Sequence, residues 1–430
     1  MNQLLEEAGF DALVEARCRR FYAPTMGRPS LAPGMYFRLL LIGYFEGLDS
    51  ERGIAWRAAD SLGRRRFLRI GLEEAPPDHS TISRTRRLID VETHREVFTW
   101  VLGVLARKGL WKGKTLGMDA TTLEANAALR SIVRRDSGEG YQEFLTKLAQ
   151  ESGIETPTRE DLARLDRKRK KKGSNREWVN PHDPEARITK RKDGRTHLAH
   201  KAEHAVDLET GAVVAVTVEG ADQGDTTTGK ETFLEAAEQV EAVGKEAAAD
   251  EKMNAKGLEE VVADKGYHSG AMVEDWREIG VRSYISEPQR GRRHWQGQRG
   301  EQAAVYGNRR RIRGEHGKQL LRRRGELLER TFAPVYDTGG MRRTHLRGHR
   351  NILKRLLLHV AAFNLRLVLR REAGVGTPRG LQDLVNRLFF CFCAVGVALE
   401  SLWESSYRQP ATSADRVPMR PPPGQLLNAA

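Results

Sequence analysis

Cysteine and long apolar runs are both scarce in this chain. Only Cys18, Cys391 and Cys393 occur, without CxxC spacing or a nearby histidine pattern, which argues against a disulfide framework and a zinc site. The longest nearly continuous apolar run, residues 388–399, has 12 residues, fewer than the roughly 20 that a membrane-spanning helix needs. We expect a buried helix there and no membrane association. Because no basic segment precedes an apolar run near the N-terminus, we also expect a cytoplasmic protein.

Internal repeats are absent too, which argues against solenoid and propeller folds. Positive charge, in contrast, is in excess: 72 Lys and Arg face 58 Asp and Glu, and the net charge is +14. Such a balance indicates an acidic polymer as partner, and nucleic acid fits best. A length of 430 residues allows one large domain or two to three smaller ones.

Helical patterns fill the first part of the chain, and we expect residues 1–110 to form a helical DNA-binding domain. A helix is predicted over residues 79–90, because two prolines and an aspartate precede it and provide a stop and a cap. Its polar side carries Arg84 and Arg87, which suit the reading of a DNA groove. A solvated helix face is the alternative for the same arginines.

Strands and helices alternate in the second predicted domain, residues 114–370. The expected elements are a strand at 115–121, a hairpin of 198–207 and 213–219, a helix at 230–243, a strand at 261–263, a helix at 269–280, a strand at 281–285, a helical segment at 327–336 and an apolar helix at 352–369. This order predicts a mixed sheet flanked by helices, an α/β architecture of the ribonuclease-H-like order.

Two segments are expected to lie outside that sheet. The insert at about 125–195 is basic and helical in part, and its charge predicts an exposed, partly disordered linker. Residues 371–430 are expected to hold a C-terminal helix and a Pro-rich, disordered tail from Gln409.

Three carboxylates stand out by their context. Asp119 interrupts an apolar, β-branched strand, where a lone buried charge would cost several kcal/mol. Asp264 ends an apolar strand, and Gly266 after it allows a sharp turn, at the kind of strand end where ligands bind. Glu329 lies on a helix that Leu328 anchors, with one face left for a carboxylate. Each residue alone is more often a cap, a turn former or a solvated side chain.

Several phrases in the sequence carry a family resemblance. They are PDHSTISRTRRLID at 77–90, GMDATTLEANAA at 117–128, VVADKGYHS at 261–269, and ERTF with GGMRRTHLRG within 329–348. With these phrases the chain resembles the DDE transposases of bacterial insertion sequences, from about residue 35 to about residue 370. The resemblance implies a ribonuclease-H-like catalytic domain with Asp119, Asp264 and Glu329 as its catalytic carboxylates, and Glu326 as the alternative third residue.

The third motif departs from the family pattern. A Tyr and an Arg usually precede its Glu and a Lys follows, whereas here Arg322, Gly325 and Tyr336 stand at those places. The resemblance also implies two Mg²⁺ (or Mn²⁺) ions on the three carboxylates, with Asp119 bridging both. Mg²⁺ prefers hard oxygen ligands, and two such ions can activate an attacking oxygen and stabilise the leaving one.

The resemblance implies double-stranded DNA as substrate, both transposon ends and target, and a homodimer in the DNA complex. We expect Lys265 and Arg322 to contact DNA, Arg322 as part of an Arg-rich stretch over 290–324. His268 is a further candidate, with a structural role as its alternative. The expected activity is binding of terminal inverted repeats followed by cleavage and strand transfer. An endonuclease without strand transfer and a catalytically inactive DNA-binding derivative are the two rival hypotheses.

Overall fold

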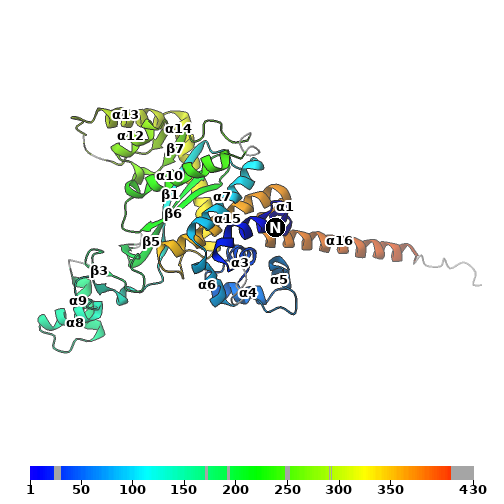
Figure 1. Ribbon diagram of the computed structural model, residues 1–430, viewed down its shortest axis with the longest axis horizontal. Coiled ribbons are helices and arrows are strands. Elements are labelled where there is room, and N and C mark those ends of the chain that lie inside the picture. Colours follow the sequence, from blue (N-terminus) through cyan, green and yellow to red (C-terminus); the bar gives the residue numbers. More distant parts are fainter. Residues whose placement is uncertain are drawn as a thin grey trace, which may run out of the picture. The chain divides into compact units, whose positions relative to one another are not determined.

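The computed structural model describes residues 1–23, 31–169, 173–190, 194–246, 252–289, 291 and 293–407. By its internal contacts the chain divides into two compact units, Met1–Thr377 and Pro378–Ala430. The first unit combines helices with a mixed sheet (Figure 1). One large apolar core within this unit includes residues of the helices and of the sheet. The second unit contains a single helix among the described residues.

The amino-terminal part of the first unit is helical, as the sequence predicted. Its helices are α1 (Asn2–Glu7), α2 (Phe10–Cys18), η1 (Arg19–Phe21), α3 (Pro33–Phe45), α4 (Glu51–Ala59), α5 (Leu62–Leu68), α6 (His79–Leu88) and α7 (Val91–Arg107). Side chains cap three of them: Ser50 accepts from Gly53, Asp78 from Ser80 and Asp90 from Thr93. These caps satisfy backbone donors that a helix start leaves free.

A mixed sheet forms the centre of the unit, and it confirms the predicted fold class. Its strands are β1 (Thr115–Glu124), β4 (Arg187–Lys190), β5 (Thr196–Asp207), β6 (Val213–Gly220), β7 (Glu260–Ala263) and β8 (Arg282–Ile285). The order is β4-β5-β1-β7-β8, and β6 pairs with β5 as the predicted hairpin. β1 is antiparallel to β5 and parallel to β7, and β7 is parallel to β8.

Helices cover both faces of the sheet. They are α10 (Asp225–Gly244), η3 (Lys265–Tyr267), α12 (Gly270–Glu278), α13 (Arg299–Arg313), α14 (Glu315–Phe332), η4 (Ala333–Thr338) and α15 (His349–Ala373). α10 lies on one face, where Thr228 and Thr232 donate hydrogen bonds to Glu203 of β5. α14 lies on the other, with Leu328 against Gly117 of β1, where an added Cβ would come within 2.8 Å of the leucine. Gly117 therefore lets this helix approach the sheet closely.

α15 joins the amino-terminal helices to the sheet. It packs against α3, α7 and β6. At its start, Asn351 accepts a hydrogen bond from Arg86 of α6, and Lys354 donates one to the Arg86 carbonyl. Further along, the Asn364 side chain pairs with both backbone groups of Val213 on β6. One helix thus connects α6 and the sheet.

The Arg-rich stretch is more ordered than the sequence predicted. Residues 299–313 and 315–332 form two helices, α13 and α14, whereas only the segment 327–336 was expected to be helical. Several of its arginines make structural contacts: Arg309 pairs with Glu287, and Arg311 donates to the Ser283 carbonyl. Only a few apolar side chains of these helices, such as Ala304, Val305 and Leu328, are buried, and the high charge outweighed them in the sequence pattern.

The insert is partly helical, as predicted, but most of its described residues are folded and do not form the exposed linker that its charge suggested. It contains η2 (Leu129–Ser131), β2 (Val133–Arg134), α8 (Tyr141–Glu151), α9 (Arg159–Lys168) and β3 (Trp178–Val179). Two small apolar clusters stabilise it, one around Trp178 and Ile132 and one around Leu145 and Leu162. The few apolar side chains suffice for local cores despite the high charge. Lys170–Lys172, part of its basic run, lie outside the described residues.

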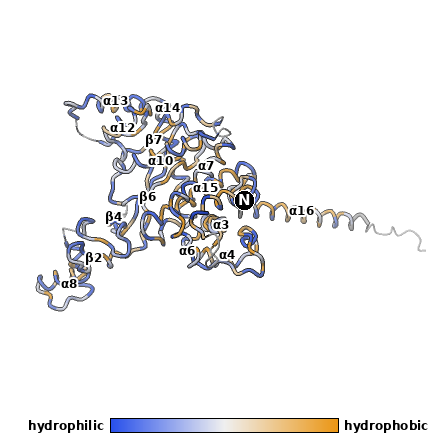
Figure 2. The backbone as a smooth tube through the Cα atoms, in the orientation of Figure 1, coloured by the Kyte–Doolittle hydropathy of each residue, from blue (hydrophilic) through white to orange (hydrophobic). Residues whose placement is uncertain are grey.

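The apolar run at 388–399 is helical but not buried, so that prediction was wrong. It lies in α16 (Pro378–Tyr407), whose large apolar side chains, Phe389, Phe392 and Trp403 among them, are exposed. Its apolar character is visible along the tube in Figure 2. Residues Gln382–Trp403 are long and apolar enough to cross a membrane, although one such helix is weak evidence. The predicted Pro-rich tail from Gln409 lies outside the described residues.

Candidate active site

Asp119 lies on β1 with a cationic partner. Its Oδ2 is 3.0 Å from Nη1 of Arg324 on α14, and its Oδ1 accepts a hydrogen bond from the Ala120 amide. Arg324 also donates to the Met118 carbonyl. Burial raises the pKa of the Asp119 carboxyl, the Arg324 guanidinium opposes that rise, and the Asp264 carboxylate adds to it. The sequence alone did not show what compensates the negative charge of Asp119. In the structure its partner is the Arg324 guanidinium.

Asp264 directly follows β7 and lies beside Asp119 on the neighbouring strand β1. In the parallel pairing of β1 with β7, Met118 is opposite Ala263, so the two aspartates follow neighbouring strand positions. Asp264 Oδ1 accepts a 2.7 Å hydrogen bond from the Gly266 amide and caps η3. The two aspartates are thus brought together by strand register, although they are far apart in sequence.

Glu329 is exposed on α14, one position after the buried Leu328. Successive residues of an α-helix are turned by about 100°, so Glu329 shares a side of α14 with Phe332, the last residue of that helix, and Tyr336 follows in the π-helix η4. Both of those rings contact His204 of β5, which is the cross-strand partner of Asp119. Glu329 therefore lies on α14 between Arg324, which contacts Asp119, and Phe332, which contacts the neighbouring strand.

Glu326 lies on a different side of the same helix. It is two positions before Leu328, nearly opposite it around the helix. Its ion pair with Arg322 is 3.9 Å long and involves two largely exposed side chains. The helix geometry therefore favours Glu329 over Glu326 as the third carboxylate.

The three carboxylates do not form a ready metal site. Within the described ranges, no group of three or more His, Cys, Asp or Glu side chains is placed to hold a metal ion. Asp119 and Asp264 supply the hard oxygen ligands that Mg²⁺ prefers, and Arg324 shows that a positive charge is accommodated at Asp119. The donor set therefore fits a divalent cation, but Arg324 would have to withdraw and Glu329 to approach.

The predicted DNA-contacting residues are all exposed. Arg84 and Arg87 lie on α6 and make hydrogen bonds to residues of the same helix, such as Ser80 and Ser83. Lys265 follows Asp264 directly, and Arg322 is 79% exposed on α14. Their position is compatible with DNA contact and equally with a solvated face, so their role stays a prediction.

His268 is buried, and its Nδ1 lies 3.5 Å from an Arg293 nitrogen. Burial at this depth favours the structural role that was its alternative.

Sequence reasoning missed several polar residues of β5 at this site. His204 is buried, with Nε2 2.5 Å from the Tyr336 hydroxyl, and burial lowers the pKa of His204 to about 3. On the opposite face of the strand, Lys201 Nζ is 2.7 Å from Glu203 Oε1 and 2.6 Å from Oδ1 of Asp225, the first residue of α10. The signal was a central strand with ionisable residues at alternating positions on both faces, which a purely structural hairpin would not carry.

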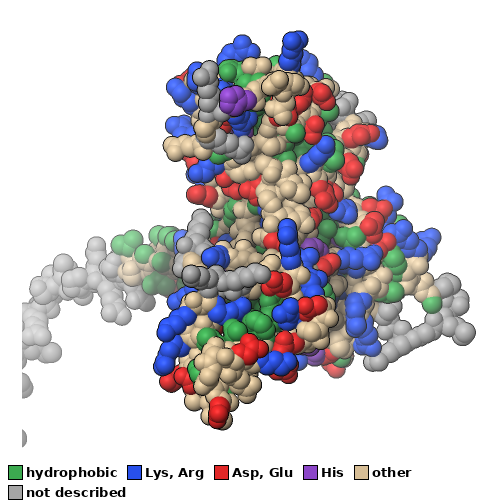
Figure 3. All heavy atoms as spheres, turned by 90° about the vertical axis from the view of Figure 1, so that its left-hand side faces the viewer, with side chains coloured by type: hydrophobic (Ala, Val, Ile, Leu, Met, Phe, Trp, Pro, Cys, Tyr) green, Lys and Arg blue, Asp and Glu red, His purple; other side chains and the backbone are tan. Residues whose placement is uncertain are grey.

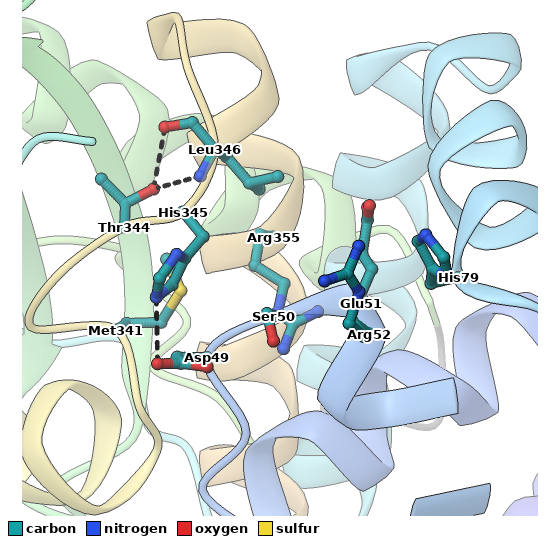
Figure 4. Close-up of a pocket in the computed structure, with 10 residues that line it drawn as sticks. All are labelled: Asp49, Ser50, Glu51, Arg52, His79, Met341, Thr344, His345, Leu346 and Arg355. Carbon is teal, nitrogen blue, oxygen red and sulfur yellow. Dashed lines mark hydrogen bonds and ion pairs between the residues drawn. The ribbon is translucent and has the colours of Figure 1, made fainter. Parts of the chain in front are cut away.

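A separate cavity of about 370 Å³ lies between the starts of α4 and α6 and the segment after η4 (Figure 4). Its lining includes Glu51, His79 and Arg355, and His345 Nε2 is 3.0 Å from Asp49 across it. None of the predicted catalytic residues lines it. This cavity marks the contact between the amino-terminal helices and the motif GGMRRTHLRG.

Comparison with known families identifies the chain. Residues 1–88 match a family model described as a transposase domain (DUF772), and residues 176–365 match one described as a transposase DDE domain. Together the two matches cover well over half of the chain. The chain belongs to the DDE-type transposases of insertion sequences. This transposase matches no curated protein.

The matched regions include some of the predicted site and exclude the rest. Asp264 and Glu329 lie within the DDE match, whereas Asp119 lies between the two matches, so its assignment depends on strand context and geometry. DDE transposases act on DNA and generally use divalent metal ions. The family resemblance and the fold that it implied are confirmed.

Proposed function

We propose that this transposase binds the terminal inverted repeats of its element and catalyses metal-dependent DNA cleavage and strand transfer. Asp119, Asp264 and Glu329 would be the metal ligands. The observation that carries the proposal is that Asp119 and Asp264 follow neighbouring positions of the parallel strands β1 and β7, next to α14, the helix that carries Glu329. One of these aspartates is half-buried, with a raised pKa.

The residues around the site each have a definable part in this chemistry. Two divalent cations on the carboxylates would supply activation of the attacking oxygen and stabilisation of the leaving one. Arg324 would hold the Asp119 carboxylate in its ionised form while no cation is bound. The neutral His204, bonded to Tyr336, packs against Phe332 and so fixes the side of α14 that carries Glu329.

DNA binding would combine a groove-reading helix with exposed basic side chains. Arg84 and Arg87 of α6 are the residues that we infer to contact the repeats, and Lys265 and Arg322 would contact DNA near the cut. Figure 3 shows a face whose upper part carries Lys and Arg side chains with acidic ones between them. Binding should depend steeply on salt, because phosphate contacts release counterions. A homodimer in the DNA complex stays a prediction of the family resemblance.

The test compares single carboxylate variants on a labelled DNA that carries the terminal repeats. Asp119→Asn, Asp264→Asn and Glu329→Gln should each abolish Mn²⁺-dependent cleavage while repeat binding in a gel-shift assay is retained. Glu326→Gln, on the same helix, is the matched control and should cleave normally. Loss of activity in Glu326→Gln but not in Glu329→Gln would reverse the assignment of the third ligand.

Two further outcomes separate the rival functions. Cleavage without joining of the cut ends to a supplied target DNA would indicate an endonuclease. Binding of the repeats without cleavage by the unaltered chain, in Mg²⁺ and in Mn²⁺, would indicate an inactive DNA-binding derivative.

A further inference from the structure

A third aspartate, Asp225, lies next to Asp264 just after the carboxyl end of β7. Asp225 is the first residue of α10, and its Oδ1 is held by Lys201 at 2.6 Å. Its Oδ2 lies against Gly266: a Cβ on that glycine would collide with this oxygen and lie 2.9 Å from Asp264 Oδ1. Gly266 is not among the residues with positive φ. It is therefore a glycine because two carboxylates converge over it, and not, as the sequence suggested, because the turn needs it.

The acidic cluster of Asp119, Glu203, Asp225 and Asp264 carries more negative charge than the protein compensates. Glu203 accepts hydrogen bonds from Lys201, Thr228 and Thr232. Lys201 serves both Glu203 and Asp225, and Arg324 serves Asp119. Lys201 is thus shared by two carboxylates, and none of the ion pairs among the described residues includes Asp264. A divalent cation beside Asp225 and Asp264 would supply positive charge there.

An unpartnered hydroxyl points to a ligand at the same place. Tyr267 is fully buried, its ring lies against Gly229, and its hydroxyl is without a hydrogen-bond partner among the described residues. Burial raises the pKa of this phenol well above its usual value, and all four carboxylates of the acidic cluster add to the rise. Leaving such a group unpaired in the interior costs folding free energy. A bound oxygen in the cluster would remove that cost.

We propose that Asp225 is a fourth carboxylate of the metal centre and binds one divalent cation together with Asp264. Lys201 holds one oxygen of Asp225 and leaves the other free to bind. Tyr267 donates its hydroxyl hydrogen to a water of the cation's shell, since Mg²⁺ keeps several waters in protein sites. This inference rests on the proposed function, because it adds a ligand to the same centre.

Binding of Mn²⁺ to the full-length chain without DNA tests it, with free Mn²⁺ measured by electron paramagnetic resonance. Asp225→Asn should weaken Mn²⁺ binding at one site at least tenfold. Asp222→Asn is the matched control, because Asp222 lies in the same connection and pairs with Arg187 at 3.5 Å near the surface. The control should bind Mn²⁺ as the unaltered chain does. Unchanged affinity and stoichiometry in Asp225→Asn would overturn the proposal.

Two further variants separate the possible failures. Asp264→Asn should also lose Mn²⁺ affinity; if it does and Asp225→Asn does not, only the fourth ligand is wrong. If Asp264→Asn binds Mn²⁺ normally, the proposed metal centre itself is wrong. Tyr267→Phe decides the matter should Asp225→Asn fail to fold, because it removes only an unpaired hydroxyl. It should bind Mn²⁺ severalfold more weakly, and unchanged affinity in Tyr267→Phe would then refute the proposal.

Discussion

Arg324 and a metal ion should compete for the Asp119 carboxylate. Replacing Arg324 with Met keeps an apolar stem of similar length and removes the charge. The Asp119 and Arg324 side chains are 30% and 15% exposed, so this pair lies between a surface ion pair, which contributes about 0–1 kcal/mol, and a buried one, whose breakage costs about 3–5 kcal/mol. We expect Arg324→Met to cost about 1–2 kcal/mol of folding free energy in EDTA, a fall of roughly 2 °C in Tm.

Saturating Mn²⁺ should reverse that loss. If Asp119 binds the cation as proposed, part of the binding energy in the unaltered chain would go into displacing Arg324, whereas in the variant the Asp119 carboxylate would already be free. A ligand at 100 times its Kd stabilises the folded state by about 2.7 kcal/mol, and a tenfold gain in affinity adds about 1.4 kcal/mol. Mn²⁺ should therefore raise the Tm of Arg324→Met by more than it raises that of the unaltered chain.

Thermal unfolding followed by fluorescence, in EDTA and in Mn²⁺, measures both effects. Arg323→Met is the matched control: it is the adjacent residue, it is exposed, and it bonds to the Glu209 carbonyl and not to the aspartate. Its response to Mn²⁺ should equal that of the unaltered chain. An equal Mn²⁺ response in Arg324→Met would refute the competition, whatever its Tm in EDTA.

Three further predictions concern packing, pH and DNA. Leu328→Ala should cost about 2–4 kcal/mol, seen as a lower Tm, because Leu328 is fully buried against β1; a Tm within 1 °C of the unaltered chain would contradict it. Burial and neighbouring carboxylates raise the pKa of Glu219 to about 7, above its unfolded value of 4.5. The contribution of Glu219 to the free energy of unfolding is therefore full below pH 4.5 and is lost as the pH rises through 7. Glu219→Gln should consequently raise Tm at pH 8 but not at pH 4.5. The gain should be about 1 kcal/mol, because solvent screens this partly exposed group. Arg84→Ala with Arg87→Ala should weaken repeat binding at least tenfold in a gel-shift titration while Tm stays unchanged, and unaltered affinity would favour the solvated face.

The sheet was predictable because its signals are local. Alternation of apolar and polar residues defined the hairpin of β5 and β6, and an apolar strand ending on a carboxylate located Asp264. The apolar run of α16 predicted a helix correctly but its burial wrongly. An apolar run favours a helix, but it does not determine whether another segment covers that helix. The order of the insert was missed for a different reason. Its core consists of a few side chains around Trp178, and in an average over the whole segment the many charged residues outweigh them.

The candidate site was predictable only in the parts that one segment determines. Asp119 and Asp264 each stand out within a strand, and the anchoring Leu328 left one face of its helix for Glu329. Contacts between side chains that are distant in sequence could not be predicted, because no local sequence pattern links β1 to α14 or β5 to α10. Thus Arg324 as partner of Asp119, and Asp225 as neighbour of Asp264, emerged only from the packing of distant segments.

α15 has a consequence for where the DNA is cut. It holds α6, through Arg86, at one end and β6, through Asn364, further along, and a helix of 25 residues extends by about 1.5 Å per residue. A rod of this kind does not stretch. If α6 grips the repeat and the sheet carries the cutting site, the number of base pairs between the gripped sequence and the cut is set by a length of protein, in the manner of a ruler.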